Sequence, residues 1–288
     1  MRIGFIGLGN MGGGMAANLV RGGHKVCAVD SAPEALARAR EHGCEIAAGL
    51  REAVVEADAV ISMLPNGAIV RAVYDEVMGH APPHALLIDC STIDVATARD
   101  LATTARRRGY AMIDAPVSGG IAAAAAGTLT FMVGGEEADF MAAQGVLGTM
   151  GKAVIHAGPN GAGQAAKVCN NMLLGASMIA TCEAFSLAGR LGLDLQTFYD
   201  ISSKASGQCW SMTSYCPVPG VGPETPADHG YEGGFATALM LKDLTLAMEA
   251  AQGAGAAVSM GRRAQELYTA FAQAGNGRLD FSAIIRTM

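Results

Sequence analysis

The stretch that decides the fold is Arg2-Ile-Gly-Phe-Ile-Gly-Leu-Gly-Asn-Met-Gly12. Its apolar first half predicts a short buried strand, and a GxGxxG pattern follows at once and leads into helical periodicity at Met15. A strand, a tight glycine turn and a helix N-terminus present backbone N–H groups to a pyrophosphate. We therefore expect a dinucleotide to contact Gly7, Leu8, Gly9, Asn10, Met11 and Gly12.

The second predicted strand, residues 25–29, ends in the carboxylate of Asp30. A carboxylate at this distance from the glycine turn accepts hydrogen bonds from the adenosine ribose hydroxyls. It would repel a 2′-phosphate, and Ser31 supplies no arginine to receive one, so we expect NAD and not NADP. The alternative is a plain glycine turn followed by an Asp that caps a helix starting at Pro33.

Strands and helices continue to alternate through the first half of the chain. Strands are predicted at 59–63, 86–89, 112–113, 129–133 and 153–156, and helices at 33–42, after 66, at 93–108 and at 136–150. This alternation predicts an α/β fold, a doubly wound Rossmann-type sheet that is mainly parallel. Ligands of such sheets bind at the carboxyl ends of the strands. Leu64-Pro65, Cys90-Ser-Thr92 and Ala115–Gly120 follow predicted strands.

The segment Ser118-Gly119-Gly120 offers a hydroxyl and two backbone N–H groups that no side chain obstructs. Such a group suits a carboxylate, so we expect these residues to bind the substrate. An ordinary Gly-Gly turn is the alternative. The neighbouring alanines, 122–126, indicate close packing and no chemistry.

A long apolar helix is predicted from Gly161 to about Leu191. Near its start Lys167 and Asn171 are four residues apart, so they share one face. Apolar neighbours indicate that Lys167 is buried, and burial disfavours a charged amine, which suits it to acid–base catalysis. The alternative is a lysine that extends its ammonium group into water.

After this helix the pattern is helical only, which predicts a separate all-α domain. The expected domains are a dinucleotide-binding domain at 1–161, an interdomain helix at 162–191 and a substrate or oligomerisation domain at 192–288. Helices are predicted at 194–203, 235–252, 259–274 and near 281.

Two side chains of this second half are candidates for a site. Trp210, the only tryptophan, lies in a Gly/Pro-rich loop at 205–234, where a loop of such length is usually functional or disordered. It is expected to form a wall of the substrate pocket, with core packing as the alternative. Lys242 lies among apolar residues and is expected to reach a cofactor, with an exposed Lys242–Asp243 pair as the alternative.

The charge and the cysteine pattern of the sequence indicate which partners and which cellular compartment to expect. The net charge is −6 and the longest basic run is Arg106-Arg107-Arg108, which argues against nucleic-acid binding. The seven cysteines are scattered and form no CxxC, so neither a disulfide framework nor a zinc or other metal site is expected. The first motif begins at Ile3, which leaves no room for a signal peptide. Together these features predict a cytoplasmic protein.

Apolar composition also favours self-association. Only 16% of residues are charged and the mean hydropathy is +0.29, so we expect a homo-oligomer, a dimer or a tetramer. The apolar stretch Met172–Ala188 contains Glu183 and small residues, which favours a buried helix over a membrane span.

The motifs together resemble the β-hydroxyacid dehydrogenase family over nearly the whole chain, from Ile3 to Met248. The matching strings are GLGNMGGGMAANL at 7–19, MLPN at 63–66, DCSTID at 89–94, DAPVSGG at 114–120, GTLTFMVGG at 127–135, GAGQAAKVCNNMLL at 161–174 and GFATALMLKDLTLAM at 234–248. Segments 206–211, 215–220 and 231–235 most resemble the branch of this family that oxidises 3-hydroxyisobutyrate in valine breakdown.

The resemblance assigns roles to residues. It implies that Lys167 is the catalytic residue and that Asn171 assists it and holds the substrate together with Ser118, Gly119 and Gly120. It implies that the cofactor touches Leu64, Pro65, Thr92 and Lys242. One departure is Ile69, where some relatives place an asparagine against the cofactor, so Ile69 is left out of the expected cofactor contacts.

The implied activity is hydride transfer from 3-hydroxyisobutyrate, or a closely related small 3-hydroxy acid, to NAD, giving methylmalonate semialdehyde. Two alternatives stay open. One is a tartronate or succinic semialdehyde reductase of the same family. The other is a dinucleotide-binding protein without turnover, although such a protein would need no combination of Lys167, Asn171 and Ser118.

Overall fold

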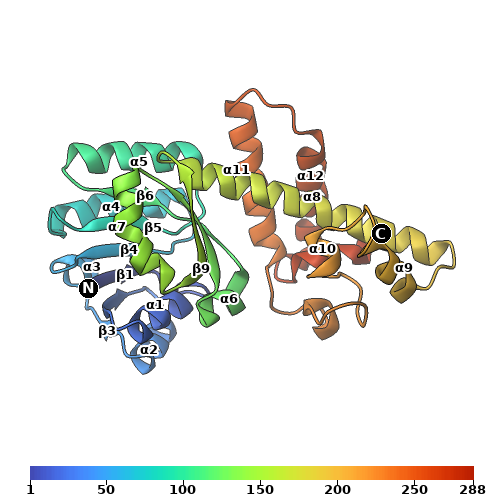
Figure 1. Cartoon of the computed structure of the whole chain (residues 1–288), viewed down its shortest axis with the longest axis horizontal. Helices are drawn as coiled ribbons and strands as arrows, with labels where there is room; N and C mark the ends of the chain where they lie inside the picture. The colour runs from blue at the N-terminus through green and yellow to red at the C-terminus, as the bar shows by residue number, and fades with distance from the viewer. The chain divides into compact units, whose positions relative to one another are not determined.

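A computed structural model describes residues 1–288. The chain divides into two compact units, Met1–Lys167 and Val168–Met288. The boundary falls inside the long helix α8, Ala162–Arg190, which is unbroken in Figure 1. The three-part division at residues 161 and 191 stays a prediction.

The first unit is built on one nine-stranded sheet. The strand order is β3-β2-β1-β4-β5-β6-β8-β7, and β9 pairs with β8. Pairing is parallel from β3 through β6, whereas β8 runs antiparallel to β6 and β7. The prediction of a mainly parallel, doubly wound sheet is confirmed. The strands are β1 Arg2–Ile6, β2 Lys25–Val29, β3 Glu45–Ile46, β4 Ala59–Ser62, β5 Leu86–Asp89, β6 Met112–Asp114, β7 Val117–Ser118, β8 Leu129–Gly134 and β9 Gly151–Gly158.

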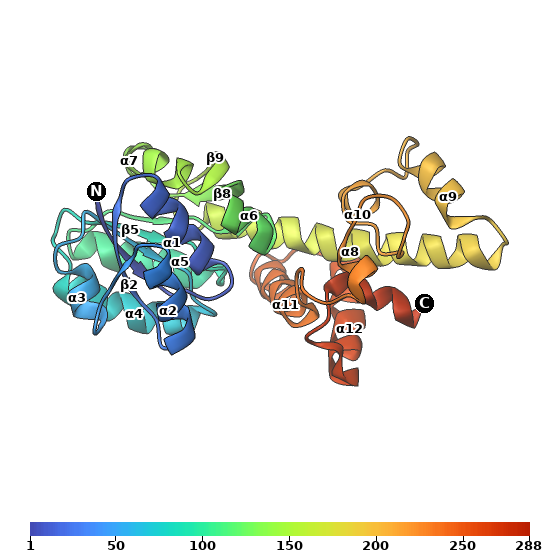
Figure 2. The same ribbon diagram turned by 90° about the horizontal axis from the view of Figure 1, so that it is seen from below.

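Helices cover both faces of this sheet (Figures 1 and 2). Neighbouring strand residues enter opposite cores, because side chains alternate along a strand: Ile88 belongs to one buried cluster and Leu87 to the other. Both are 0% exposed, as expected for parallel strands that read as continuous apolar runs. The helices are α1 Gly12–Arg21, α2 Pro33–Glu41, α3 Leu50–Val54, α4 Gly67–His80, α5 Val95–Arg107, α6 Gly120–Ala126 and α7 Glu137–Gly148.

The short elements β3, α3, β7 and α6 were not predicted, because each is too short to show a periodicity. The expectation of close packing holds for part of α6: Ala124 is buried and Ala123 packs against the core, whereas Ala122, Ala125 and Ala126 are exposed. A Cβ at Gly14 of α1 would lie 2.9 Å from the backbone carbon of Ala124, so α1 and α6 touch backbone to backbone.

The second unit is all-helical, as predicted. Its core contains Met178, Met240, Leu244, Tyr268 and Phe281, contributed by α8 and by the helices that follow it. After α8 the elements are α9 Leu195–Ser202, α10 Trp210–Thr213, the 3-10 helix η1 Pro226–His229, α11 Thr237–Gly253, α12 Ser259–Phe271, the π-helical turn η2 Ala272–Asn276 and the 3-10 helix η3 Phe281–Thr287.

The Gly/Pro-rich segment 205–234 contains α10 and η1 and is held by hydrogen bonds to Asp280. The buried carboxylate of Asp280 accepts hydrogen bonds from the Tyr215 hydroxyl and the Phe235 amide, each at 2.8 Å. Gly234, between these partners in space, has φ +64°, and a Cβ there would lie 2.2 Å from Asp280 Oδ2. Glycine is therefore required at this position.

Helix α8 is long and apolar enough, by length and composition alone, to cross a membrane. Within its most apolar window, 39% of the residues are buried inside the structure, and the core helix of a soluble protein passes the same test. Leu173 and Leu187 on this helix are 67% and 57% exposed.

The first turn of α8 is fixed by Asp114, the last residue of β6. Its Oδ1 accepts from the Gly161 amide at 2.6 Å and its Oδ2 from the Gln164 amide at 2.9 Å. A carboxylate satisfies helix N-terminal N–H groups and is stabilised by the helix dipole. Burial raises the pKa of Asp114, and these amide hydrogen bonds oppose the rise. At Gly163 a Cβ would lie 2.3 Å from Met132 O, so the helix start lies directly against β8.

Replacing Asp114 by alanine should lower the free energy of unfolding by about 1–3 kcal/mol, because it leaves buried amides of α8 without an acceptor. Urea denaturation followed by circular dichroism measures this. Asp100→Ala removes an exposed carboxylate that pairs with Arg71 and should cost under about 1 kcal/mol. Equal losses in the two variants would contradict the anchoring role.

Candidate active site

The glycine turn between β1 and α1 has the geometry of a phosphate cradle. Gly7 has φ +93°, and a Cβ on it would lie 2.3 Å from Met63 O, while a Cβ on Gly12 would lie 1.9 Å from Gly7 O. Gly9 instead has no atom within 4 Å of a Cβ position, so space is open where a pyrophosphate would approach. The first turn of α1 carries no acidic residue to repel phosphate. These residues fit a dinucleotide.

Asp30, at the end of β2, lies against this turn. Its Oδ2 accepts from the Leu8 amide at 2.5 Å and its Oδ1 accepts from the Ala32 amide at 2.8 Å. Each carboxylate oxygen has a further lone pair, which leaves acceptors for ribose hydroxyls. The carboxylate thus holds the glycine turn in addition to its predicted role toward the ribose.

The ends of β1, β4 and β5 are adjacent, and hydrogen bonds connect the loops that follow them. The Met63 amide donates to Ile6 O at 2.9 Å, and the Cys90 amide donates to Ser62 O at 2.8 Å. The Leu64 amide donates to the buried Ser91 hydroxyl at 2.8 Å. This arrangement brings the loops of Leu64, Pro65 and Thr92 to the same edge of the sheet as the glycine turn.

Gln164 ties the Thr92 loop to helix α8. Its Nε2 donates to Ser91 O at 2.7 Å, and its Oε1 accepts from the Ile93 amide at 3.1 Å. Gln164 is 0% exposed and lies three residues before Lys167. The start of α8 is therefore hydrogen-bonded to the loop that is predicted to contact the cofactor.

Beneath this edge lies a buried acid, Asp89. Its Oδ1 accepts from the Ser62 hydroxyl at 2.7 Å and the Ser91 amide at 3.1 Å, whereas Oδ2 has no hydrogen-bond partner. The Ser62 hydroxyl also lies 2.9 Å from the Tyr74 hydroxyl. Burial raises the pKa of Asp89 to about 6, against the opposing effect of its hydrogen bonds.

The Ser118 segment has the predicted form. Ser118 ends β7 and is half-buried. Gly119 is the N-cap of α6 with φ +135°, and Gly120 is the first residue of that helix with φ +73°. A Cβ on Gly119 would lie 2.6 Å from Ala123 Cβ, so a larger residue would displace the turn. The chain from Asp114 to Ser118 connects the helix anchor to this segment in four residues.

Lys167 is buried, with 7% of its surface exposed, so the burial that its neighbours predict is confirmed. It is the last residue of the first unit, and Asn171 follows one turn later on the same helix with 2% exposed. Their catalytic roles stay predictions at this point.

In the second unit, one buried carboxylate contacts two predicted site residues. Asp243 of α11 accepts a hydrogen bond from Asn171 Nδ2 and lies 3.4 Å from Lys242 Nζ. Asp243 is 3% exposed and the Lys242 side chain is 31% exposed, so they do not form the exposed surface pair that was the alternative.

Trp210 begins α10 and is 50% exposed, which excludes simple core packing. Its ring stacks on Tyr215 at 4.9 Å between centroids, and Asp280 holds the Tyr215 hydroxyl. The indole is thus held on one face and open on the other, and its place in a substrate pocket stays a prediction.

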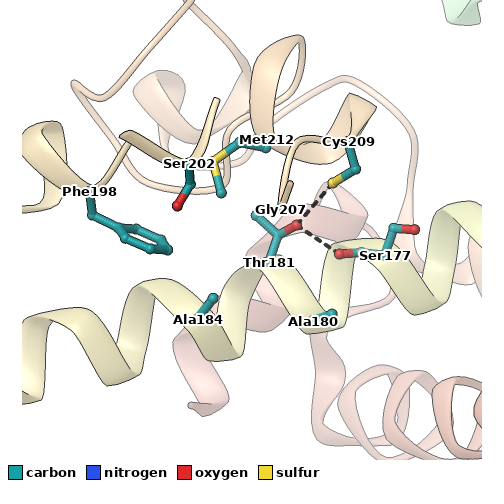
Figure 3. Close-up of a pocket in the computed structure, with 9 residues that line it drawn as sticks. All are labelled: Ser177, Ala180, Thr181, Ala184, Phe198, Ser202, Gly207, Cys209 and Met212. Atoms are coloured by element: carbon teal, nitrogen blue, oxygen red, sulfur yellow. Dashed lines mark hydrogen bonds between the residues drawn. The ribbon is translucent and has the colours of Figure 1, made fainter. Parts of the chain in front are cut away.

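A separate cavity of about 350 Å³ lies in the second unit (Figure 3). Around it the Thr181 hydroxyl donates to Ser177 O at 2.8 Å and lies 3.5 Å from Cys209 Sγ. The lining includes Phe198 and Met212 but no charged group and no predicted site residue, so it offers no acid or base for hydride transfer. The structure also contains no group of three or more His, Cys, Asp or Glu placed to hold a metal ion, and all seven cysteines are free.

Sequence reasoning missed the residues that hold the site, namely Asp89, Ser91, Asp114, Gln164 and Asp243. All five stand inside a quoted motif, and Ser91 and Asp243 are each next to a predicted residue; this was the available signal. Their buried hydrogen bonds join segments far apart in the chain, so no local pattern shows them.

Comparison with known proteins matches both halves of the chain. Residues 2–158 match the family model described as the NAD binding domain of 6-phosphogluconate dehydrogenase. Residues 161–288 match the one described as NAD-binding of NADP-dependent 3-hydroxyisobutyrate dehydrogenase.

The chain is also similar over its full length to proteins named 3-hydroxyisobutyrate dehydrogenase. A probable 3-hydroxyisobutyrate dehydrogenase of Mycobacterium tuberculosis is 50% identical over 99% of this chain and 97% of the relative. The 3-hydroxyisobutyrate dehydrogenase of Pseudomonas aeruginosa is 46% identical over 98% of this chain and 96% of that protein. A solved structure of the Mycobacterium tuberculosis enzyme with L-serine has a TM-score of 0.95, at 50% identity, over 99% of this chain and 98% of that one.

The raised pKa of Asp89 predicts a pH dependence of stability. The folded carboxyl keeps its proton up to about pH 6, whereas the unfolded one loses it near 3.8. The stabilisation is therefore complete below pH 3.8 and is lost as the pH rises through about 6. The amide introduced by Asp89→Asn does not titrate, so the unfolding free energy of the wild type minus that of this variant should fall across this window.

Urea denaturation at several pH values between about 4 and 7 measures this difference. Glu76→Gln, which removes an exposed acid from α4, is the matched control and should show little dependence. A flat difference for Asp89→Asn would contradict the assignment.

Proposed function

The chain belongs to the 3-hydroxyisobutyrate dehydrogenase family, and we propose that it transfers hydride between 3-hydroxyisobutyrate, or a closely related small 3-hydroxy acid, and NAD. The product in the oxidising direction is methylmalonate semialdehyde, an intermediate of valine degradation. The observation that carries the proposal is the buried Lys167, one helical turn before the buried Asn171, on a helix that Asp114 and Gln164 join to the Ser118 and Thr92 segments.

The residues for the cofactor are those of the sheet edge. Gly7–Gly12 would hold the pyrophosphate and Asp30 the adenosine ribose, with Leu64, Pro65, Thr92 and Lys242 as further contacts. When bound, NAD accepts the hydride from the carbinol carbon of the substrate. The carboxylate of Asp30 favours NAD over NADP because it repels a 2′-phosphate.

The substrate class follows from the Ser118 segment. The Ser118 hydroxyl and the Gly119 and Gly120 amides can donate hydrogen bonds to a carboxylate. The related Mycobacterium tuberculosis enzyme was solved with L-serine, which is itself a small 3-hydroxy acid. Trp210, with one ring face open, supports the pocket as an apolar wall.

Lys167 is the acid–base group in this proposal. In the oxidising direction its neutral amine takes the proton of the substrate hydroxyl as the carbon–hydrogen bond breaks. In the reducing direction the ammonium returns that proton to the carbonyl oxygen. Burial favours the neutral amine that the oxidation requires, and Asn171 holds the reacting hydroxyl by a hydrogen bond.

The proposal extends to the cellular compartment and the oligomeric state of the protein. We place the protein in the cytoplasm because its seven free thiols suit a reducing compartment, and its net charge of −6 offers no footprint for nucleic acid. We infer a homo-oligomer, a dimer or tetramer without membrane attachment, in which another copy covers the exposed leucines Leu173, Leu187 and Leu191.

Lys167→Ala should lower kcat about 10²- to 10⁴-fold, because it removes the acid–base group. Mixing protein, NAD and 3-hydroxyisobutyrate and following the absorbance of the reduced cofactor measures turnover, and a fluorescence titration measures NAD binding, which should stay near the wild type. Lys152→Ala, at an exposed lysine of β9, is the control. Turnover within a few-fold of the wild type in Lys167→Ala would refute the role.

A panel of substrates separates the proposal from its alternatives. The panel contains 3-hydroxyisobutyrate and other small 3-hydroxy acids for oxidation, and tartronate semialdehyde and succinic semialdehyde for reduction. Preferred reduction of either semialdehyde would place the chain among the semialdehyde reductases. Absence of turnover with every member of the panel, together with tight NAD binding, would indicate a non-catalytic dinucleotide-binding protein.

Asp30→Arg should raise the NADP/NAD ratio of kcat/KM, because it removes the repulsion and adds a phosphate ligand. Since Asp30 also holds the Leu8 amide, kcat/KM with NAD should fall in absolute value. Asp30→Asn keeps a side-chain acceptor for that amide and serves as the control for loosening of the turn. An unchanged ratio in Asp30→Arg would remove Asp30 from the ribose site.

A further inference from the structure

We propose that Asp243 is a positioning residue that fixes the orientation of the Asn171 carboxamide for the reaction. The inference rests on the proposed function, in which Asn171 holds the reacting hydroxyl. Its basis is the place of Asp243, a buried carboxylate in contact with a predicted catalytic residue and a predicted cofactor residue.

The contact with Asn171 selects one of the two orientations of the amide. A carboxylate only accepts hydrogen bonds, so the side of Asn171 that faces Asp243 must be its NH₂ group. The reverse orientation would set the amide oxygen against the carboxylate oxygen and leave both buried acceptors unsatisfied. Asn171 Oδ1 is consequently turned away, where it accepts from Asn170 Nδ2 at 2.9 Å.

The two oxygens of Asp243 have different partners. Oδ2 accepts from Asn171, and Oδ1 lies 3.4 Å from Lys242 Nζ. The side chain of Asp243 is 4% exposed, so little water can replace these partners, and they offset the cost of burying the carboxylate. The carboxylate is thereby held between the amide and the ammonium group, and it keeps the amide in one orientation.

This orientation decides what Asn171 offers a ligand. One N–H is used by Asp243, so the second N–H and a remaining lone pair of Oδ1 are left at defined positions. An asparagine side chain at position 243 could donate as well as accept and would tolerate either orientation of the amide. The variant Asp243→Asn should therefore keep the packing of α11 but no longer favour one orientation of the Asn171 carboxamide.

A double-mutant cycle tests the proposal. Steady-state kinetics with NAD and 3-hydroxyisobutyrate are compared for the wild type, Asp243→Asn, Asn171→Ala and the double variant. Asp243→Asn should lower kcat about 10- to 100-fold, with a smaller change in KM for NAD. The double variant should have a kcat within about threefold of that of Asn171→Ala, because the carboxylate acts through Asn171. Glu249→Gln, at an exposed acid on the same helix, should leave kcat unchanged.

Each outcome decides the question. Losses that multiply in the double variant, or an Asp243→Asn enzyme within threefold of the wild type, would overturn the positioning role and leave the proposed function intact. Absence of turnover by the wild type would overturn the proposed function and this inference with it.

If circular dichroism shows that Asp243→Asn is unfolded, Asp243→Glu takes its place in the cycle. It keeps the charge beside Lys242 but moves the acceptor oxygen. A kcat equal to that of the wild type would then contradict the proposal, and a loss that vanishes with Asn171→Ala would support it.

Discussion

The interaction on which the site depends is that between the Asp114 carboxylate and the first amides of helix α8. Asp114 ends a central strand, and the helix it holds carries Lys167 in its second turn. The same residue begins the segment that leads to Ser118. One buried acid thus sets the origin of both the proposed proton-transfer group and the proposed substrate loop, and the tight approach at Gly163 leaves the helix no room to shift.

Much of the first unit could be predicted because its signals are local. The glycine turn, the apolar strands and the helix lengths each follow from a pattern within about fifteen residues, and the burial of Lys167 follows from its apolar neighbours. The short strand β7 and the short helix α6 could not be predicted, since two to seven residues show no periodicity. The structure inside 205–234 was also hidden, because it depends on the distant Asp280.

The supporting acids share one physical character that sequence alone does not display. Asp89, Asp114, Asp243 and Asp280 are all under 5% exposed, and each accepts hydrogen bonds from amides or hydroxyls. Burying a carboxylate is costly unless it is so bonded, and those bonds join segments that are up to about seventy residues apart. The sequence therefore indicates the side chains that are proposed to face a ligand, and it does not indicate the side chains that hold them.

The continuity of α8 has a consequence for how the proposed catalytic pair, Lys167 and Asn171, is inherited. Lys167 closes one compact unit and Asn171 belongs to the next, yet only three residues of unbroken helix separate them. Their spacing is a property of helical geometry, which any sequence able to keep that turn helical reproduces. Loops and surface residues elsewhere can thus diverge and change the substrate specificity, while the spacing between the Lys167 amine and the Asn171 amide stays the same.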